Sequence, residues 1–229
     1  MRYDNIDFPF LYSKASDYGI RLSESHLNLF EVYLKELIEW NSRMNLTGID
    51  ERGRMIIELF LDSLIPVPYL PLKGRMLDVG SGAGFPALVI KLLIPGLKLY
   101  MVEAGSKKVS FLKQVIRLLR ISDIEAVNGR VEVVGDKLVA EGFDIISARA
   151  LADLKRVIRW CSHLLSNKGL LVYFSGCGVE ENLKSCEGLM RERHLTVDHL
   201  IPYHLPGMQE SRGIIILKKE ITEPISGKK

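Results

Sequence analysis

One segment constrains the fold of this chain more than any other, the stretch LDVGSGAG at residues 77–84. The residues before it, RMLDV, predict a buried strand, and a helix is expected from about Pro86 to Leu93. Gly80, Gly82 and Gly84 stand between the two elements, where glycine lets the backbone turn sharply and lets a ligand approach closely. A glycine motif indicates a ligand site only between such a strand and such a helix, and this motif has that setting.

The chain beyond this loop alternates strand-like and helix-like segments. The expected strands lie at 97–103, 124–130, 143–150 and 169–176, and the expected helices at 106–120 and about 152–165. Such alternation predicts an α/β fold with a doubly wound, mostly parallel sheet. Two further strand-like runs at 194–205 and 212–220 suit an antiparallel hairpin at the sheet edge.

The N-terminal part has a different pattern. Residues 1 to about 22 show little periodicity, and Ser23 is a helix cap for an apolar stripe that runs from Leu27 to Ile38. A second helical pattern runs from Met55 and ends near Pro66. We therefore predict an N-terminal helical extension at 1–70, a Rossmann-like domain at 71–220 and a flexible tail at 221–229.

Composition excludes several classes of protein. No apolar run among the 229 residues approaches the roughly 20 needed to span a bilayer, and the N-terminus does not resemble a signal peptide. Cys161, Cys177 and Cys186 form no CxxC pair, so we expect no metal site and no disulfide framework. We therefore expect a cytoplasmic protein without a membrane partner, and a monomer. The net charge of +3 is too small to indicate a nucleic-acid partner by itself.

Two carboxylates accompany the glycine loop. Glu103 ends the second strand, where it can accept hydrogen bonds from both ribose hydroxyls of a nucleoside. Asp78 lies two residues before Gly80 and suits the cationic amino-acid end of S-adenosylmethionine, whereas it would repel a pyrophosphate. The GxGxG spacing also differs from the GxGxxG of dinucleotide sites, so S-adenosylmethionine is favoured over NAD. A merely structural turn is the alternative.

Two more segments bear on the chemistry. Asn128–Glu132 follows the third strand, where backbone amides near Val131 can bind an adenine edge, although an ordinary turn is an equal reading. Arg149 ends the fourth strand, where it can bind a base or a phosphate or form a structural ion pair. The Asn-Pro-Pro run of amino-methylating enzymes and the Pro-Cys nucleophile of pyrimidine C5 methylation are absent. Guanine N7 has a free lone pair and needs neither.

The helix after Glu103 carries a basic face. Its cationic residues are Lys107, Lys108, Lys113, Arg117 and Arg120. Together they can contact several phosphates of an RNA, although a solvated charged face is the commoner meaning of such a pattern.

These motifs resemble one family, the bacterial 16S ribosomal RNA guanine-N7 methyltransferases known as RsmG or GidB. The resemblance runs from about Ser23 to Lys219. It rests on WNSRMNLTGI at 40–49, FLDSL at 60–64, LDVGSGAGFP at 77–86, VEAGSKKVSFL at 102–112, NGRVE at 128–132, SARAL at 147–151 and SRGIIILKK at 211–219.

The resemblance implies a Rossmann-like class I methyltransferase that methylates N7 of one guanine in the 530 loop of 16S rRNA, with the small ribosomal subunit or its RNA as partner. The cofactor residues expected from the loop and from the resemblance are Asp78, Gly80, Gly82, Gly84, Phe85, Glu103, Ala104, Val131, Glu132 and Arg149. The residues expected to serve catalysis or substrate binding are Arg130, Arg149 and Arg212.

Two positions depart from the family pattern. Leu59 stands where the family usually has histidine, and Ser175 where it usually has lysine at the end of the fifth strand. A methyltransferase for a small molecule or a protein, and a non-catalytic module that binds the cofactor or RNA, are the alternative functions.

Overall fold

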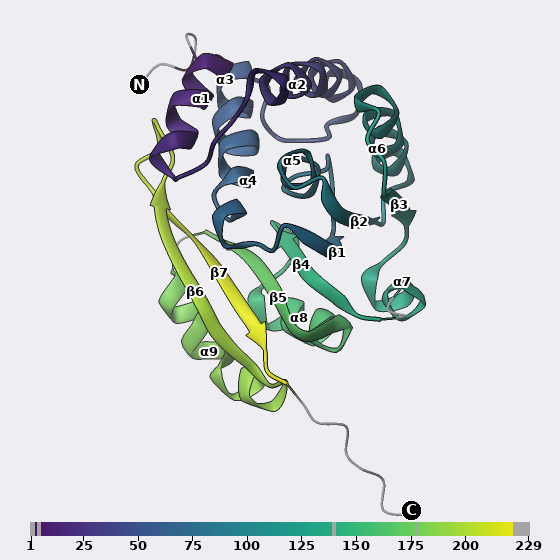
Figure 1. The fold of residues 1–229 in the computed structure, drawn as a ribbon, viewed down its shortest axis with the longest axis vertical. Helices are drawn as coiled ribbons and strands as arrows, with labels where there is room; N and C mark the ends of the chain where they lie inside the picture. Colours follow the sequence, from purple (N-terminus) through teal and green to yellow (C-terminus); the bar gives the residue numbers. More distant parts are fainter. Residues whose placement is uncertain (1–2, 4–5, 139–140, 177, 222–229) are drawn as a thin grey trace, which may run out of the picture.

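A seven-stranded sheet forms the centre of the molecule (Figure 1). The structure, a computed structural model, describes residues 3, 6–138, 141–176 and 178–221. The strands in sheet order are β3 (Ile124–Asn128), β2 (Gly96–Glu103), β1 (Lys73–Val79), β4 (Phe143–Arg149), β5 (Leu165–Ser175), β7 (Ser211–Lys219) and β6 (Leu195–His204). The predicted α/β fold with a mostly parallel sheet is confirmed.

The register of the strands brings the functional segments to one edge of the sheet. The strands β3, β2, β1, β4 and β5 are parallel, with Val79 opposite both Val102 and Ala148. The predicted edge hairpin is confirmed, because β7 pairs antiparallel with β5 and with β6. Gly213 lies opposite Ser175, so the start of β7 joins the carboxyl ends of the parallel strands. Ligands of open α/β sheets bind at this edge.

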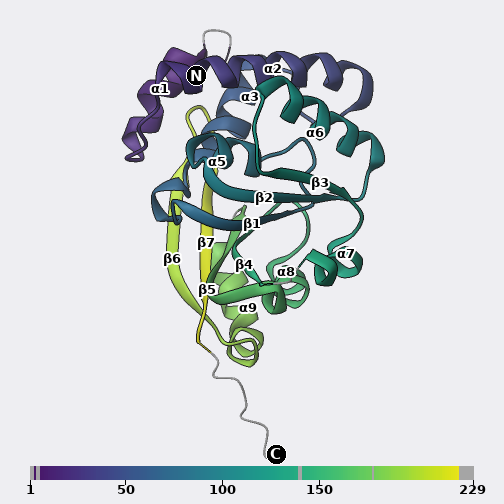
Figure 2. The same ribbon diagram turned by 45° about the vertical axis from the view of Figure 1, so that its right-hand side comes forward.

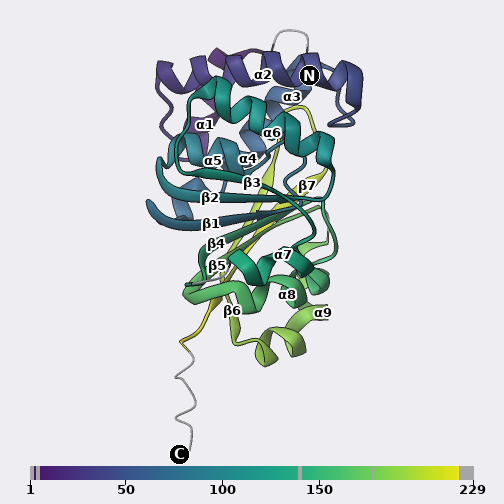
Figure 3. The same ribbon diagram turned by 90° about the vertical axis from the view of Figure 1, so that its right-hand side faces the viewer.

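Helices cover both faces of the sheet, as Figure 3 shows with the sheet seen edge-on. The helices of one face are α1 (Phe8–Asp17), α2 (Glu24–Met44), α3 (Arg52–Met55), α4 (Asp62–Leu64), α5 (Ala87–Leu93) and α6 (Ser106–Leu119). Those of the other face are α7 (Val131–Leu138), α8 (Leu154–Cys161) and α9 (Val179–Glu192). Each face has its own apolar cluster, since alternate residues of a strand point to opposite faces: Ile214 and Ile216 join one cluster, Ile215 and Leu217 the other.

The N-terminal helices form the outer layer of one face (Figure 2). A six-residue π-helix, η2 (Ile56–Leu61), joins α3 to α4, and all six of its residues are buried. Phe30, Tyr33 and Phe60 share one apolar cluster with the residues of α5 and α6. The boundary expected at 66–74 falls on the short helix η3 (Val67–Tyr69) and the start of β1. The division at residue 70 stays a prediction.

Three helices were not expected from the sequence. The expectation of an irregular lead-in is wrong, because Asp7 caps α1 by accepting from the Phe10 amide at 3.0 Å, and Phe8, Leu11 and Ala15 are buried. The helix α9 was overlooked although Val179, Leu183, Cys186 and Met190 recur at helical spacing and pack on one apolar cluster, and α7 has only eight residues. The predicted flexible tail lies outside the described residues from 222 onward. No helix in the described part of the chain is both long and apolar enough to cross a membrane.

Candidate functional site

The glycine loop has the conformation that its sequence predicts. Gly80, Gly82 and Gly84 have φ of 70°, 54° and 91°, a region that favours glycine. The Gly80 amide donates to the Val102 carbonyl at 2.8 Å, which ties the loop to β2. A Cβ atom on Gly82 would meet nothing closer than 3.8 Å, so this glycine leaves open space beside the loop.

Glu103 fixes the loop from the end of β2. Its Oε2 accepts from the Gly82 amide at 2.9 Å and its Oε1 from the Gly105 amide at 2.8 Å. Asn128 donates from Nδ2 to the Glu103 carbonyl at 3.0 Å, which joins the end of β3 to the same edge. A carboxylate oxygen accepts more than one hydrogen bond, so Glu103 retains acceptor capacity toward a ligand.

A pocket of about 290 Å³ opens at this edge, and its lining includes several of the predicted residues. Its lining consists of Val79, Gly80, Val102, Glu103, Ala104, Gly129, Arg130, Val131, Glu132, Leu151 and Trp160. The third strand ends at Asn128, two residues earlier than predicted, and the last bond of its ladder is donated by the Gly129 amide to the Glu103 carbonyl at 3.0 Å. Leu151 and Trp160 were not predicted as site residues. The position of Leu151 two residues after the fourth strand is the sequence signal that could have found it.

Asp78 lies under the loop and is 1% exposed. Its Oδ1 accepts from Ser147 Oγ at 2.5 Å, whereas its Oδ2 is buried without a hydrogen-bond partner among the described residues. Burial raises the pKa of Asp78 to about 6, against the opposing effects of the Ser147 and Ser81 hydroxyls and of Arg149. An unpaired buried carboxylate oxygen is costly, and a cationic ligand group would satisfy it.

These features fit S-adenosylmethionine. The unpaired Oδ2 of Asp78 suits an ammonium group, Glu103 suits ribose hydroxyls, and the mostly apolar pocket between β2 and the start of α7 suits a purine ring. The open space beside Gly82 gives the backbone room for a close ligand.

Phe85 points away from the pocket. Its ring stacks on Tyr33 of α2 at 4.9 Å between centroids and meets Phe60 edge-on at 5.1 Å. Tyr33 is fully buried and donates its hydroxyl to the Ala83 carbonyl of the glycine loop, and burial raises the pKa of this hydroxyl well above its usual value. Phe85 therefore anchors the loop to the N-terminal helices.

The structure brings Arg149 and Arg212 together, although 63 residues separate them in the chain. Arg149 Nη2 lies 3.2 Å from Asp62 Oδ2, and Arg212 Nη1 lies 3.4 Å from Asp62 Oδ1. Arg212 also pairs with Glu58 at 3.3 Å, and Arg149 donates to the Glu58 carbonyl. Tyr203 donates its hydroxyl to Asp62 Oδ1 at 2.6 Å. Arg149 therefore forms the structural ion pair that the sequence left open as one alternative, and the meeting of Arg149 with Arg212 on Asp62 was not predicted.

The two departures from the family pattern lie near this cluster. Leu59 belongs to η2 and is 7% exposed, so an apolar side chain fills its position. Ser175 ends β5 and accepts at Oγ from Asn182 Nδ2 of α9 at 3.0 Å.

The basic helix is α6, and its cations spread along its length. Lys107 and Lys108 lie in the first turn, directly after the pocket residues Glu103 and Ala104. The helix runs back along the sheet over 14 residues, about 20 Å, so Arg117 and Arg120 lie toward the amino edge. Arg120 caps α6 with φ of 52°, and Arg117 donates to Gln114 Oε1 at 2.7 Å.

Thiol and metal chemistry have no visible site in the described residues. Cys161 and Cys186 are buried free thiols, and burial raises the pKa of Cys161 to about 12. Cys177 lies outside the described residues. No group of three His, Cys, Asp or Glu side chains is placed to hold a metal ion in the part that the structure describes.

Solved structures with a similar fold include proteins named as methylases or methyltransferases. A ribosomal protein L11 methylase from Lactobacillus delbrueckii subsp. bulgaricus superposes with a TM-score of 0.56 at 18% identity, covering 76% of this chain and 81% of that one. TYW2 from M. jannaschii, solved in complex with AdoMet, gives 0.55 at 8% identity, with coverages of 70% and 75%. At these identities the likeness concerns the fold.

Sequence relatives extend over nearly the whole chain. The protein named ribosomal RNA small subunit methyltransferase G from Chloroflexus aggregans is 35% identical over 216 residues, 93% of this chain and 90% of its own. The protein of the same name from Thermoanaerobacter pseudethanolicus is 33% identical, over 91% and 88%. The family model for rRNA small subunit methyltransferase G matches residues 26–215. This chain therefore belongs to the rRNA small subunit methyltransferase G family.

Proposed function

We propose that this protein methylates N7 of one guanine in the 530 loop of 16S rRNA, with S-adenosylmethionine as the methyl donor. The observation that carries the proposal is the pocket at the carboxyl edge, where Glu103, the open glycine loop and the unpaired Oδ2 of Asp78 fit this cofactor in a chain of the rRNA small subunit methyltransferase G family. When bound, the cofactor supplies an electrophilic methyl group.

The residues that line the pocket, together with Asp78, which is buried under the glycine loop and does not line the pocket, would share the binding of the cofactor. Glu103 would accept from the ribose hydroxyls and Asp78 would pair with the ammonium group, while the backbone near Val131 and Glu132 would meet the adenine. Leu151 and Trp160 would close the apolar side of the pocket. Ala104 and Gly80 also line the pocket. The chain would thus orient the cofactor by groups that follow the ends of the four strands β1, β2, β3 and β4.

The acceptor needs placement more than activation. N7 of guanine carries a lone pair in the plane of the ring and no proton, so neither a base nor a covalent nucleophile is required. A buried Cys161 with a pKa near 12 agrees with a reaction that uses no thiolate. Catalysis would then consist of in-line positioning and exclusion of water.

The arginines are the proposed substrate groups. Arg149 lies at the end of β4 and Arg212 at the start of β7, with 15% and 22% of their side chains exposed. Arg130 is exposed and lines the pocket. A guanidinium offers paired donors to a phosphate or to a guanine edge. Asp62 and Glu58 hold two of them in place before the RNA arrives.

The proposed partner is the small-subunit rRNA, and the proposed enzyme is a cytoplasmic monomer. Lys107 and Lys108 at the start of α6 would contact the phosphates nearest the pocket. Lys113, Arg117 and Arg120 would extend this contact along the helix toward the amino edge.

A methyl-transfer assay tests the proposal. The protein would be incubated with radiolabelled S-adenosylmethionine and small ribosomal subunits from a strain that lacks the endogenous enzyme, and the label mapped. Label at a single guanine N7 is expected, and none with Arg149→Ala, whose fold and cofactor affinity would be measured in parallel. Cofactor binding without transfer to the RNA would contradict the proposal.

A further inference from the structure

A second basic surface lies beside the pocket, on α8. We infer that the exposed face of α8, defined by Lys155, Arg156 and Arg159, binds the phosphate backbone of the substrate RNA; this inference rests on the rRNA-methylating function proposed above. It follows from the place of α8, from its division into two faces and from the lack of acidic partners around its cations.

The helix α8 lies beside the pocket. It starts five residues after Arg149, and Asp153 caps it by accepting from the Arg156 amide at 2.8 Å. Leu151 just before the helix and Trp160 near its end both line the pocket. An RNA whose target base enters this edge of the sheet would therefore pass over α8.

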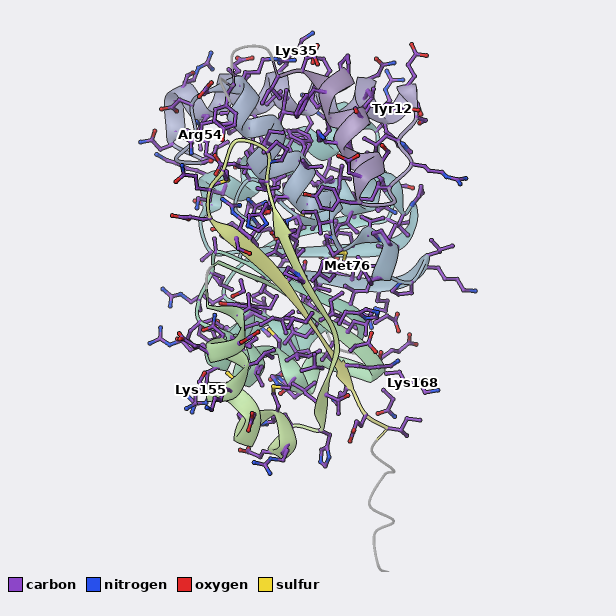
Figure 4. All side chains as sticks on the ribbon, turned by 90° about the vertical axis from the view of Figure 1, so that its left-hand side faces the viewer. Tyr12, Lys35, Arg54, Met76, Lys155 and Lys168 are labelled. Carbon is purple, nitrogen blue, oxygen red and sulfur yellow. The ribbon has the colours of Figure 1, made fainter. Side chains whose placement is uncertain are left out.

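The two faces of α8 are sharply divided. Leu154, Val157, Ile158 and Cys161 are buried against the sheet, whereas the three cations are exposed. Lys155 and Arg159 are four residues apart and so are neighbours on the helix surface. In Figure 4, Lys155 lies on the same side of the molecule as Arg54 and opposite Lys168, which lies in the first half of β5. Lys155 thus lies on the side at which the parallel strands end.

Few acidic groups neutralise this surface. Among the described residues, no hydrogen bond or ion pair holds the side chain of Lys155 or Arg159. Arg156 approaches Asp153 only at 3.6 Å, and both side chains are more than half exposed, so a phosphate could replace this pairing. The lining of the neighbouring pocket adds the exposed cation Arg130 and the carboxylate Glu132.

The phosphate backbone of RNA fits this surface better than other partners. Guanidinium and ammonium groups that are exposed and unpaired bind phosphates and release counterions, which gives affinity without sequence preference. The α8 face adds no exposed apolar side chain of the kind that a protein or membrane partner would cover. On α6, by contrast, Arg117 and Arg120 lie far from the pocket.

Two triple variants with equal loss of charge test the inference. One is Lys155→Gln with Arg156→Gln and Arg159→Gln on α8, and the matched control is Lys113→Gln with Arg117→Gln and Arg120→Gln on α6. Binding of each full-length chain to a 16S rRNA transcript would be measured over a range of salt concentrations, and binding of S-adenosylhomocysteine in parallel. The α8 variant should lower RNA affinity about tenfold or more and reduce the slope of log K against log salt by about 2, with unchanged S-adenosylhomocysteine affinity.

The control and the activity assay separate the possible failures. In the α6 variant, the slope of log K against log salt should fall by less than half as much as in the α8 variant. An α8 variant with the salt slope of the unmodified protein, or a larger loss from the α6 variant, would overturn the inference. Because binding is read without methyl transfer, a protein that binds RNA through α8 but labels no guanine would refute the proposed function alone.

Discussion

At the scale of single residues, the site depends on carboxylates whose surroundings differ. Glu103 is held by two backbone amides, which satisfy its charge without a cation. Asp78 is more deeply buried and has one oxygen without a partner among the described residues. Glu103 is therefore suited to accept hydrogen bonds from neutral hydroxyls, whereas Asp78 is suited to pair with a cationic group.

The raised pKa of Asp78 predicts a pH dependence. Between about pH 4 and 6 the folded protein keeps a proton on Asp78 that the unfolded chain releases. The free energy of unfolding therefore falls as pH rises through this range, and the contribution of Asp78 is constant above it. A bound ammonium group prefers the carboxylate and has the opposite effect. S-adenosylhomocysteine, which has the same amino-acid end, should therefore bind about tenfold more weakly at pH 5 than at pH 7.

Calorimetric titration at pH 5, 6, 7 and 8 would measure this dependence. The Asp78→Asn variant keeps the acceptor for Ser147 but has no charge, so its affinity should be lower at pH 7 and nearly flat with pH. Equal slopes for the two proteins would show that Asp78 does not bind the ammonium group.

At the scale of elements, the N-terminal helices reach the site by two routes. Through α2, the Tyr33 hydroxyl and ring hold the glycine loop at Ala83 and Phe85. The carboxylates of Glu58 in η2 and Asp62 in α4 form ion pairs with Arg212 and Arg149. A π-helix is uncommon and often marks a functional position, and here it carries Glu58 toward the carboxyl edge.

Tyr33→Phe should weaken cofactor binding as well as stability. The change keeps the ring stacked on Phe85 but leaves the buried Ala83 carbonyl without its donor, which should cost about 1–3 kcal/mol of unfolding free energy. Tyr18→Phe is the matched control, because Tyr18 donates to the His204 carbonyl at 2.8 Å away from the loop. Urea unfolding should show losses for both, whereas titration with S-adenosylhomocysteine should show weaker binding for Tyr33→Phe alone. Equal affinities in the two variants would contradict a role for Tyr33 in the loop.

Asp62→Ala should be destabilising. It removes the shared carboxylate of the half-buried Arg149 and Arg212 and leaves the buried Tyr203 hydroxyl without its acceptor, which should cost about 1–3 kcal/mol of unfolding free energy. Glu39→Ala removes the exposed pair with Arg43 and should cost less than about 1 kcal/mol. Chemical denaturation compares the two, and a loss for Asp62→Ala no larger than that for Glu39→Ala would show that the cluster is replaceable.

At the scale of the whole molecule, one apolar cluster joins the N-terminal helices to the sheet. Phe60 contacts both Tyr33 and Phe85, at 5.4 and 5.1 Å between ring centroids, and Trp40 contacts Phe111 of α6 at 5.6 Å. These rings carry the largest apolar areas of that layer, so their contacts dominate its packing.

Removal of residues 1–70 should therefore abolish cooperative folding of the rest. The shortened chain would expose the faces of α5 and α6 that now lie in the cluster, including Phe85 and Phe111. Loss of near-ultraviolet circular dichroism and of a cooperative thermal transition is expected. A fragment 71–229 that unfolds cooperatively and binds S-adenosylhomocysteine would instead establish an independent domain.

The sequence by itself was sufficient for the fold class, the order of the main elements and the conformation of the glycine loop. These features are local, since alternation of strands and helices, glycine spacing and Asp78 or Glu103 beside a strand end all appear within about 30 residues. Sequence reasoning did not predict the helices α1, α7 and α9. In α1 the cap residue Asp7 supplies much of the signal, and in α7 and α9 only two residues each are buried.

Only the tertiary structure decided how distant residues meet. It placed Arg149 and Arg212 on the same Asp62, it turned Phe85 toward Tyr33, and it made Trp160 a wall of the pocket. Each of these contacts joins positions far apart in the chain, and each depends on which layer packs on which face of the sheet. The loop LDVGSGAG could thus indicate a cofactor, but only packing determined which side chains surround it.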